Sequence, residues 1–243
     1  MNTKTAGLFI LAILISFFGG FYLANTLNRS ELEALRGAKN PPANSPQNDA
    51  EQTLSPEEIQ QKLAEADASP GNVQFQRSLG MALYRYASMK QDVKLLSEVA
   101  RLLTRVNEKN PADREVEITL GNLYFDIGYF QKDNENLKKA QQFYQKILAK
   151  TPDDVDVRTD YALTYFLQGP PEYDKAVAEF QRSLETNPKH EKTLRFLIQT
   201  LLKQEKTREA ESYLARLKEV DPSTPSLSEI RAQMKRDENT SAQ

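Results

Sequence analysis

The sequence predicts an all-α protein in which helix pairs repeat along the chain behind one apolar N-terminal segment. Prolines close the phrases "EKNP", "AKTP", "ETNP" and "KEVDP" at Pro111, Pro152, Pro188 and Pro222. With Pro70 they are separated by 41, 41, 36 and 34 residues, and proline disfavours helical geometry in the residue before it. Between the prolines, apolar residues recur at the i, i+3, i+4, i+7 spacing of a helix face. A recurring period of this length indicates a repeat architecture.

The apolar segment is long enough to span a membrane. No charged residue occurs from Thr5 to Asn28, and residues 6–24 read "AGLFILAILISFFGGFYLA". A helix of this length, at about 1.5 Å per residue, reaches roughly the 30 Å of a bilayer core. A cleaved signal peptide is the alternative, but Tyr22 stands where cleavage after Ala24 requires a small residue. A core helix fits least, because the segment is apolar all round. We expect a short tail at 1–5 and a transmembrane signal anchor at 6–27.

Two signals oppose each other on membrane orientation. Arg29, Arg36 and Lys39 follow the segment and only Lys4 precedes it, which favours a cytoplasmic C-terminal part. A very short tail with one lysine before an apolar run is, in contrast, how a signal anchor with an exported domain begins. We favour export.

A linker separates the anchor from the folded part. Residues 28–54 form a juxtamembrane segment and a flexible Pro/Asn/Gln-rich linker without apolar periodicity, so they cannot bury a core. Ser55, Pro56 and Glu58 then fit the N-cap, first position and capping box of a helix. We expect an N-terminal cap helix at 55–70, helix pairs at about 71–111, 112–152, 153–188 and 189–222, a C-terminal cap helix at 223–236 and a disordered tail at 237–243.

Gly121 interrupts an apolar helix face in "LGNLYFDIG", at a cost of about 1 kcal/mol relative to alanine. Ala140 lies twelve residues before Pro152, and the same offset before the next two prolines gives Ala176 and Ala210. Small residues let two helix backbones approach closely, so we expect them to meet where the helices of a pair cross. The expected pairs are Gly121 with Ala140, Gly80 with Val99, and Ala162 with Ala176.

This pattern resembles the tetratricopeptide repeat (TPR) family, whose signature has Leu-Gly-x-x-Tyr, a later Ala-x-x-x-Phe and a closing Pro at 34-residue spacing. The second block matches at Leu120, Gly121, Tyr124, Gly128, Ala140, Tyr144 and Pro152, and the third at Ala162, Tyr165, Gly169, Tyr173, Ala176, Phe180 and Pro188. The first block keeps Leu79, Gly80 and Pro111, and the last keeps Ala210 and Pro222. The family's tryptophan is absent, because the chain has no Trp. The resemblance covers residues 71–222.

The resemblance implies a right-handed α-solenoid of about four helix pairs with a concave groove lined by the first helix of each pair. Its repeat-packing positions are Gly80, Gly121, Tyr124, Ala140, Ala162, Tyr165, Ala176, Phe180 and Ala210. Its groove positions are Arg77, Met81, Tyr84, Ile118, Asn122, Phe125, Thr159, Leu163, Phe166, Lys192, Arg195 and Gln199. We expect several apolar groove residues to be exposed beside Lys192 and Arg195, which would suit a partner with apolar anchors and an acidic or carboxylate end. The alternative is that neighbouring repeats partly cover them.

The first three blocks, with proline intervals of 41, 41 and 36 residues, are longer than the family's 34-residue period. Tyr124 to Ala140 is 16 residues and Tyr165 to Ala176 is 11, against about 9 in the family pattern. In the second block, either each helix gains one turn, which preserves the packing phase, or "QKDNEN" forms a bulge. The segment "GPPEYD" in the third block contains two prolines and must be a turn.

Composition and motifs argue against several activities. The chain has no Cys, which excludes disulfides and thiol catalysis, and it has no phosphate loop or H-E-x-x-H pattern. The formal net charge is −2 with Lys and Arg spread along the chain, which does not suggest nucleic acid. His190, the only histidine, follows Pro188 without a Ser or carboxylate at a motif spacing, so we expect an exposed loop residue. We expect no catalytic residue, metal ligand, cofactor or small-molecule substrate.

The sequence therefore predicts a non-enzymatic, membrane-tethered scaffold that binds a peptide or protein partner in its groove. The order of anchor, spacer and TPR stack looks like that of bacterial extracytoplasmic assembly factors. This likeness implies a single-pass protein of the bacterial inner membrane with periplasmic repeats. The alternatives are an accessory subunit of an export translocon or of the cytochrome c maturation machinery and, with least support, an enzyme subunit.

Overall fold

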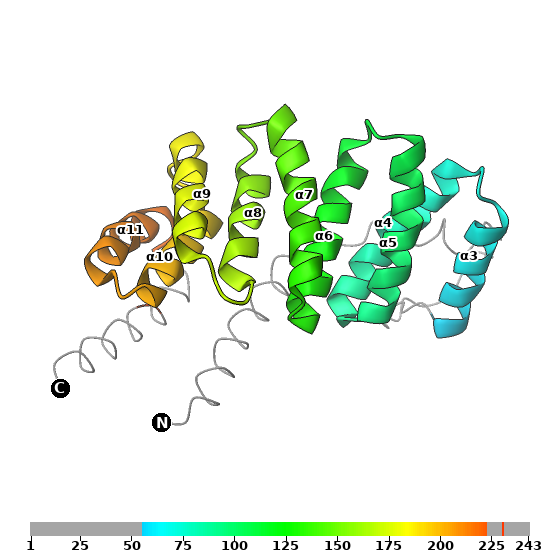
Figure 1. Ribbon diagram of the computed structural model, residues 1–243, viewed down its shortest axis with the longest axis horizontal. Helices are drawn as coiled ribbons and strands as arrows, with labels where there is room; N and C mark the ends of the chain where they lie inside the picture. The colour runs from blue at the N-terminus through cyan, green and yellow to red at the C-terminus, as the bar shows by residue number, and fades with distance from the viewer. Residues whose placement is uncertain (1–54, 223–229, 231–243) are drawn as a thin grey trace, which may run out of the picture. The chain divides into compact units, whose positions relative to one another are not determined.

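The computed structural model describes residues 55–222 and Ile230, and this part of the chain consists of α-helices joined by short turns (Figure 1). The expected anchor at 6–27, the linker at 28–54 and the tail at 237–243 lie outside the described residues. So does the expected cap helix at 223–236, apart from Ile230, which is helical and buried. Within residues 55–222, no helix combines the length and apolar character needed to cross a membrane.

The described helices fall into two compact units that meet in sequence at residues 111 and 112. The first unit contains α3 (Pro56–Ala68), α4 (Val73–Lys90) and α5 (Val93–Lys109). The expected capping box at the start of α3 is present: the Ser55 hydroxyl accepts from the backbone N–H of Glu58, and the Glu58 carboxylate accepts from the N–H of Ser55. Two donors of the first turn are thereby satisfied.

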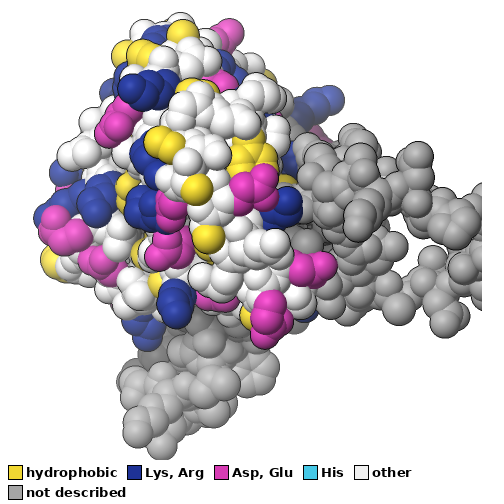
Figure 2. Space-filling view, turned by 90° about the vertical axis from the view of Figure 1, so that its right-hand side faces the viewer, with side chains coloured by type: hydrophobic (Ala, Val, Ile, Leu, Met, Phe, Trp, Pro, Cys, Tyr) yellow, Lys and Arg dark blue, Asp and Glu magenta, His cyan; other side chains and the backbone are white. Residues whose placement is uncertain are grey.

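The core of the first unit lies between α4 and α5. Leu79 and Leu83 of α4 are buried together with the apolar face of α5, which includes Leu96 and Leu103. Figure 2 shows the surface on the side of the first unit where α3 lies. Lys and Arg side chains alternate there with Asp and Glu, and the apolar side chains appear as small separate areas. This face therefore offers neither a broad apolar patch nor a field of one sign.

The second unit contains three helix pairs in sequence. They are α6 (Arg114–Gln131) with α7 (Asn134–Lys150), α8 (Val155–Leu167) with α9 (Tyr173–Thr186), and α10 (Glu191–Lys203) with α11 (Thr207–Val220). The helices of each pair pack along each other, and α7 with α8 and α9 with α10 join the pairs into a stack (Figure 1). α8 also touches both other first helices, α6 and α10.

Acidic N-caps begin several of these helices. The carboxylates of Asp92, Asp113 and Asp154 each accept from the backbone N–H three residues later. Such caps satisfy a first-turn donor and place negative charge at the positive end of the helix dipole.

The extra residues of the two 41-residue blocks lengthen their helices. The four helices α4 to α7 have 17 or 18 residues, and α8 to α11 have 13 or 14. Only Lys132 and Asp133 separate α6 from α7, and Lys132 takes the left-handed conformation at φ 55°. The added-turn prediction is confirmed and the bulge alternative is wrong. Residues 168–172, which include "GPPE", form the expected non-helical turn between α8 and α9.

Gly121 and Gly80 do mark close helix approaches, but the nearest side chains are not those of the predicted small residues. A Cβ on Gly121 would lie 2.7 Å from Cε1 of Tyr144, and one on Gly80 would lie 2.4 Å from Cδ2 of Leu103. Each contacting residue lies four positions after the predicted one, Ala140 or Val99. The reason is that helical side chains lean toward the N-terminus and so cover the preceding turn. A large side chain, rather than a second small one, fills the space.

Candidate partner-binding surface

In the first unit, α4 carries the predicted groove residues Arg77, Met81 and Tyr84. Met81 and Tyr84 are buried and only Arg77 is half-buried. The prediction of exposed apolar side chains is therefore wrong on α4. Buried residues occupy every position from Leu79 to Tyr84. This part of α4 is therefore covered on all sides, whereas the prediction assumed that one face stays open.

In the second unit, the predicted residues divide into buried and half-buried sets. Phe125 on α6 and Leu163 on α8 are only 4% and 1% exposed, which contradicts their predicted exposure. Each first helix lies against the second helix of its own pair, and α8 also lies against α6 and α10. This arrangement supports the alternative that neighbouring helices cover such side chains. The half-buried set consists of Ile118, Asn122, Phe166, Lys192, Arg195 and Gln199.

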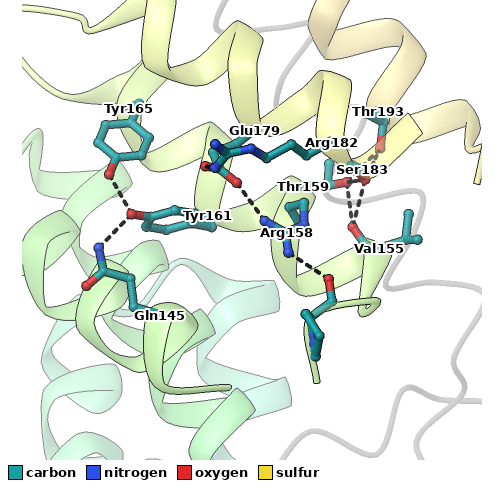
Figure 3. A network of polar contacts seen from close by, with 11 residues as sticks. Gln145, Val155, Arg158, Thr159, Tyr161, Tyr165, Glu179, Arg182, Ser183 and Thr193 are labelled. Atoms are coloured by element: carbon teal, nitrogen blue, oxygen red, sulfur yellow. Dashed lines mark hydrogen bonds and ion pairs between the residues drawn. The ribbon is translucent and has the colours of Figure 1, made fainter. Parts of the chain in front are cut away.

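Thr159, another predicted groove residue, is fully buried in a cluster of three hydroxyls (Figure 3). Its Oγ1 lies 2.6 Å from that of Thr193 and 3.1 Å from Oγ of Ser183, and the latter two lie 3.1 Å apart. The carbonyl of Val155 accepts from Thr159 at 2.7 Å and from Ser183 at 3.2 Å. The cluster joins α8, α9 and α10, so Thr159 holds helices together and does not line a surface.

His190 is half-buried and has partners, which corrects the prediction of an exposed loop residue. Its Nδ1 lies 2.6 Å from Oγ1 of Thr193 and its Nε2 lies 3.2 Å from Oδ1 of Asp156. The hydrogen bond with His190 lowers the pKa of Asp156. Carboxylate, imidazole and hydroxyl thus lie in a row, but Thr193 is fully buried. A substrate has no access to that hydroxyl, so the row joins α8 to the start of α10 and is not a nucleophile site.

The two predicted cations of the groove are paired within the fold. Nζ of Lys192 lies 2.5 Å from Oδ1 of Asp160 across α8 and α10, and these side chains are 21% and 20% exposed. Nη1 of Arg195 lies 3.4 Å from Oε1 of Glu191, one turn earlier on α10. The sequence prediction missed Asp160, although its position 32 residues before Lys192 is close to the repeat period.

Tyrosines at two repeat-packing positions, Tyr124 and Tyr165, contact the second helix of their own pair. Tyr124 stacks on Phe143 with ring centroids 5.8 Å apart, and Nζ of Lys139 lies 5.3 Å from the Tyr124 ring. Tyr165 repeats the arrangement with Nζ of Lys175 at 5.5 Å. The Tyr165 hydroxyl lies 2.6 Å from that of Tyr161 (Figure 3). Burial, and to a smaller extent this hydrogen bond, raises the pKa of Tyr165.

These positions therefore have packing roles. Gly80, Ala140, Ala162, Ala176, Phe180 and Ala210 are buried as well. The described residues contain no group of three His, Asp or Glu side chains arranged to hold a metal ion.

Known proteins share this architecture. Residues 121–154 and 172–234 match two models described as tetratricopeptide repeat. A search of curated proteins finds no significant match.

Solved structures match over about two thirds of this chain or slightly more. A crystal structure of MamA superposes with a TM-score of 0.54 at 18% identity, over 68% of this chain and 87% of that one. A MamA RS-1 double mutant gives 0.53 at 15% identity, over 70% and 86%. YrrB, described as a TPR protein with an unusual peptide-binding site, gives 0.50 at 13% identity, over 72% and 89%. The likeness establishes the fold of the described part, and with the two matching segments it shows that this chain carries tetratricopeptide repeats.

Proposed function

We propose that the chain is a membrane-tethered TPR scaffold that binds a peptide or protein partner along the first helices of its second unit and serves extracytoplasmic protein assembly. The observation that supports the binding surface is the half-buried set on three successive first helices. Ile118 and Asn122 lie on α6, Phe166 lies on α8 and Gln199 lies on α10. α8 contacts both of its neighbours in this series, so these residues belong to adjoining helices.

The membrane tether rests on the sequence before the repeats. The charge-free run from Thr5 to Asn28 has the length of a bilayer span. A tethered domain meets a membrane-bound partner at a higher effective concentration than a freely diffusing one.

Site-specific photo-crosslinking in cells tests the surface. A photoreactive benzoylphenylalanine placed at Phe166 or at Gln199 is expected to capture a partner. Matched controls place the same group at the exposed Gln142 of α7 and Glu211 of α11, on second helices. Adducts at the controls alone would move the surface to the second helices, and no adduct at any of the four positions would contradict a scaffold role.

Protease accessibility tests the tether and its orientation. The chain is expected in the membrane fraction, and protease added to spheroplasts is expected to digest the repeats. Protection until lysis would reverse the orientation. A soluble chain with a mature N-terminus near Asn25 would show cleavage and remove the tether.

A further inference from the structure

The charges on the first helices of the second unit bear on the chemistry of the partner. Lys192 and Arg195 are the cations that the groove prediction places beside a partner's carboxylate. Asp160 lies 2.5 Å from Lys192, and Glu191 lies 3.4 Å from Arg195. Each cation is therefore neutralised by an acidic side chain of α8 or α10 before any partner arrives.

An incoming carboxylate gains little at such pairs. It would either displace Asp160, exchanging one ion pair for another, or lie beside it as a second negative charge. The first exchange changes the binding free energy little, because the carboxylate of the partner also loses its hydration. The second is repulsive, since like charges at close range disfavour each other. Asp156, which lies 3.2 Å from Nε2 of His190 at the start of α10, adds a further negative group.

The remaining half-buried side chains are uncharged. Ile118 and Phe166 offer apolar surface, and Phe166 is supported by Tyr173 with ring centroids 5.7 Å apart. Asn122 and Gln199 offer side-chain amides. The carbonyl oxygen of Asn122 accepts from the Tyr144 hydroxyl at 2.9 Å, which orients the amide. Apolar contacts with a few placed amides suit a segment recognised through uncharged side chains and its backbone.

We propose that this surface, as the binding site of the proposed function, selects an uncharged peptide segment with apolar side chains and rejects segments that present Asp, Glu or a C-terminal carboxylate. Asp160 is the specificity-determining residue, because it neutralises Lys192 and repels a second carboxylate. Binding through such a surface depends weakly on salt, since the charged pairs stay within the protein.

Selection from a phage-displayed library of random twelve-residue peptides, panned on the full chain in detergent micelles, tests the proposal. The selected peptides are expected to be depleted in Asp and Glu. The Kd of a synthetic, fluorescein-labelled selected peptide is expected to change less than about twofold between 50 and 500 mM NaCl. Binding of a carboxylate by exposed cations would instead weaken roughly tenfold or more over this range.

The variant Asp160→Asn provides the sharper measurement. It removes the carboxylate beside Lys192, so the affinity for an Asp-containing version of the winning peptide is expected to rise about fivefold or more. Asp153→Asn is the matched control, because Asp153 is exposed and its substitution changes the net charge by the same amount. It is expected to leave both affinities within about twofold.

The outcomes separate the two proposals. Enrichment of acidic peptides, or equal responses of the two Asp→Asn variants, would overturn the selectivity and leave a peptide-binding scaffold in place. Failure to enrich any peptide would overturn the proposed function and the selectivity with it.

Discussion

At Gly121 the backbone of α6 lies so close to α7 that a Cβ would stand 2.7 Å from Cε1 of Tyr144. The Tyr144 ring cannot move aside easily, because the residue is buried and its hydroxyl donates to Asn122 at 2.9 Å. The glycine thus gives up about 1 kcal/mol of helix propensity and lets a tyrosine fill the crossing between the two helices.

We therefore expect Gly121→Leu to lower the free energy of unfolding by about 1–3 kcal/mol through overpacking. Urea unfolding of the full chain measures it. Gly71→Leu is the control, because a Cβ there meets no atom within 4 Å. Equal midpoints for the two variants would show that Gly121 does not lie at a tight crossing.

Asp67, at the end of α3, receives hydrogen bonds from two arginines of α5. Arg101 donates to both carboxylate oxygens at 2.8 and 2.9 Å and Arg105 donates at 2.7 Å. The hydrogen bond from Arg101, with that from Arg105, outweighs burial and lowers the pKa of Asp67 from 3.8 to about 2.

A carboxyl with a lowered pKa stabilises the folded state above its unfolded pKa, near 3.8, and this contribution is lost as the pH falls through about 2. The full shift would correspond to about 2.4 kcal/mol. The Asp67 and Arg101 side chains are 43% and 44% exposed, so solvent screening reduces the expected loss to about 0.5–1 kcal/mol. Urea midpoints of the wild type and Asp67→Asn should differ at pH 6 and converge as the pH falls from 4 toward 2. A constant difference would contradict the assignment.

At the scale of elements, α6 and α7 are joined by a carboxylate that is almost fully buried. Glu117 of α6 is 1% exposed, and its oxygens lie 2.6 Å from Nζ of Lys146 and 3.0 Å from Nζ of Lys150 on α7. Burial raises the pKa of Glu117, but the hydrogen bonds and charges of the two lysines more than offset it and leave the pKa below 4.5. The carboxylate therefore stays charged at neutral pH and depends on both lysines.

Removing both lysines, with Lys146→Met and Lys150→Met together, leaves this charge buried and is expected to cost about 3 kcal/mol of stability. Adding Glu117→Gln to that variant should recover part of the loss, because the amide carries no charge. Chemical denaturation at pH 7 measures the free energies of unfolding of the double and triple variants. A triple variant less stable than the double would indicate that Glu117 is stabilised by groups other than these lysines.

At the scale of the whole molecule, the described helices form two compact units. Repeat stacks are stabilised mainly between neighbouring helices, so local damage need not spread. The approaches at Gly80 and Gly121 lie in different units, which allows each unit to be destabilised separately.

Hydrogen exchange of the full chain is expected to show this division. Gly121→Leu should speed amide exchange in α6–α11 and leave α3–α5 close to wild type, and Gly80→Leu should do the reverse. Opening of both units in either variant would show that they unfold as one cooperative body.

The sequence alone indicated a series of helix pairs closed by prolines. Prolines, caps such as Ser55 with Glu58, and the apolar spacing act locally, within a few residues of the chain, so their effect can be read without knowing the neighbours in space. The same local logic showed that Gly121 lies at a close approach and that the two prolines at 170 and 171 lie in a turn.

The tertiary structure decided which side chains meet and which remain open. Tyr144 rather than Ala140 lies nearest to Gly121, because helical side chains lean toward the N-terminus and cover the preceding turn, which a pattern of small residues does not show. Phe125 and Leu163 are covered and Lys192 is paired with Asp160, because burial and ion pairing depend on every helix around a residue. The repeat period therefore predicts the fold, and the packing of helices from different repeats sets the chemistry of the surface.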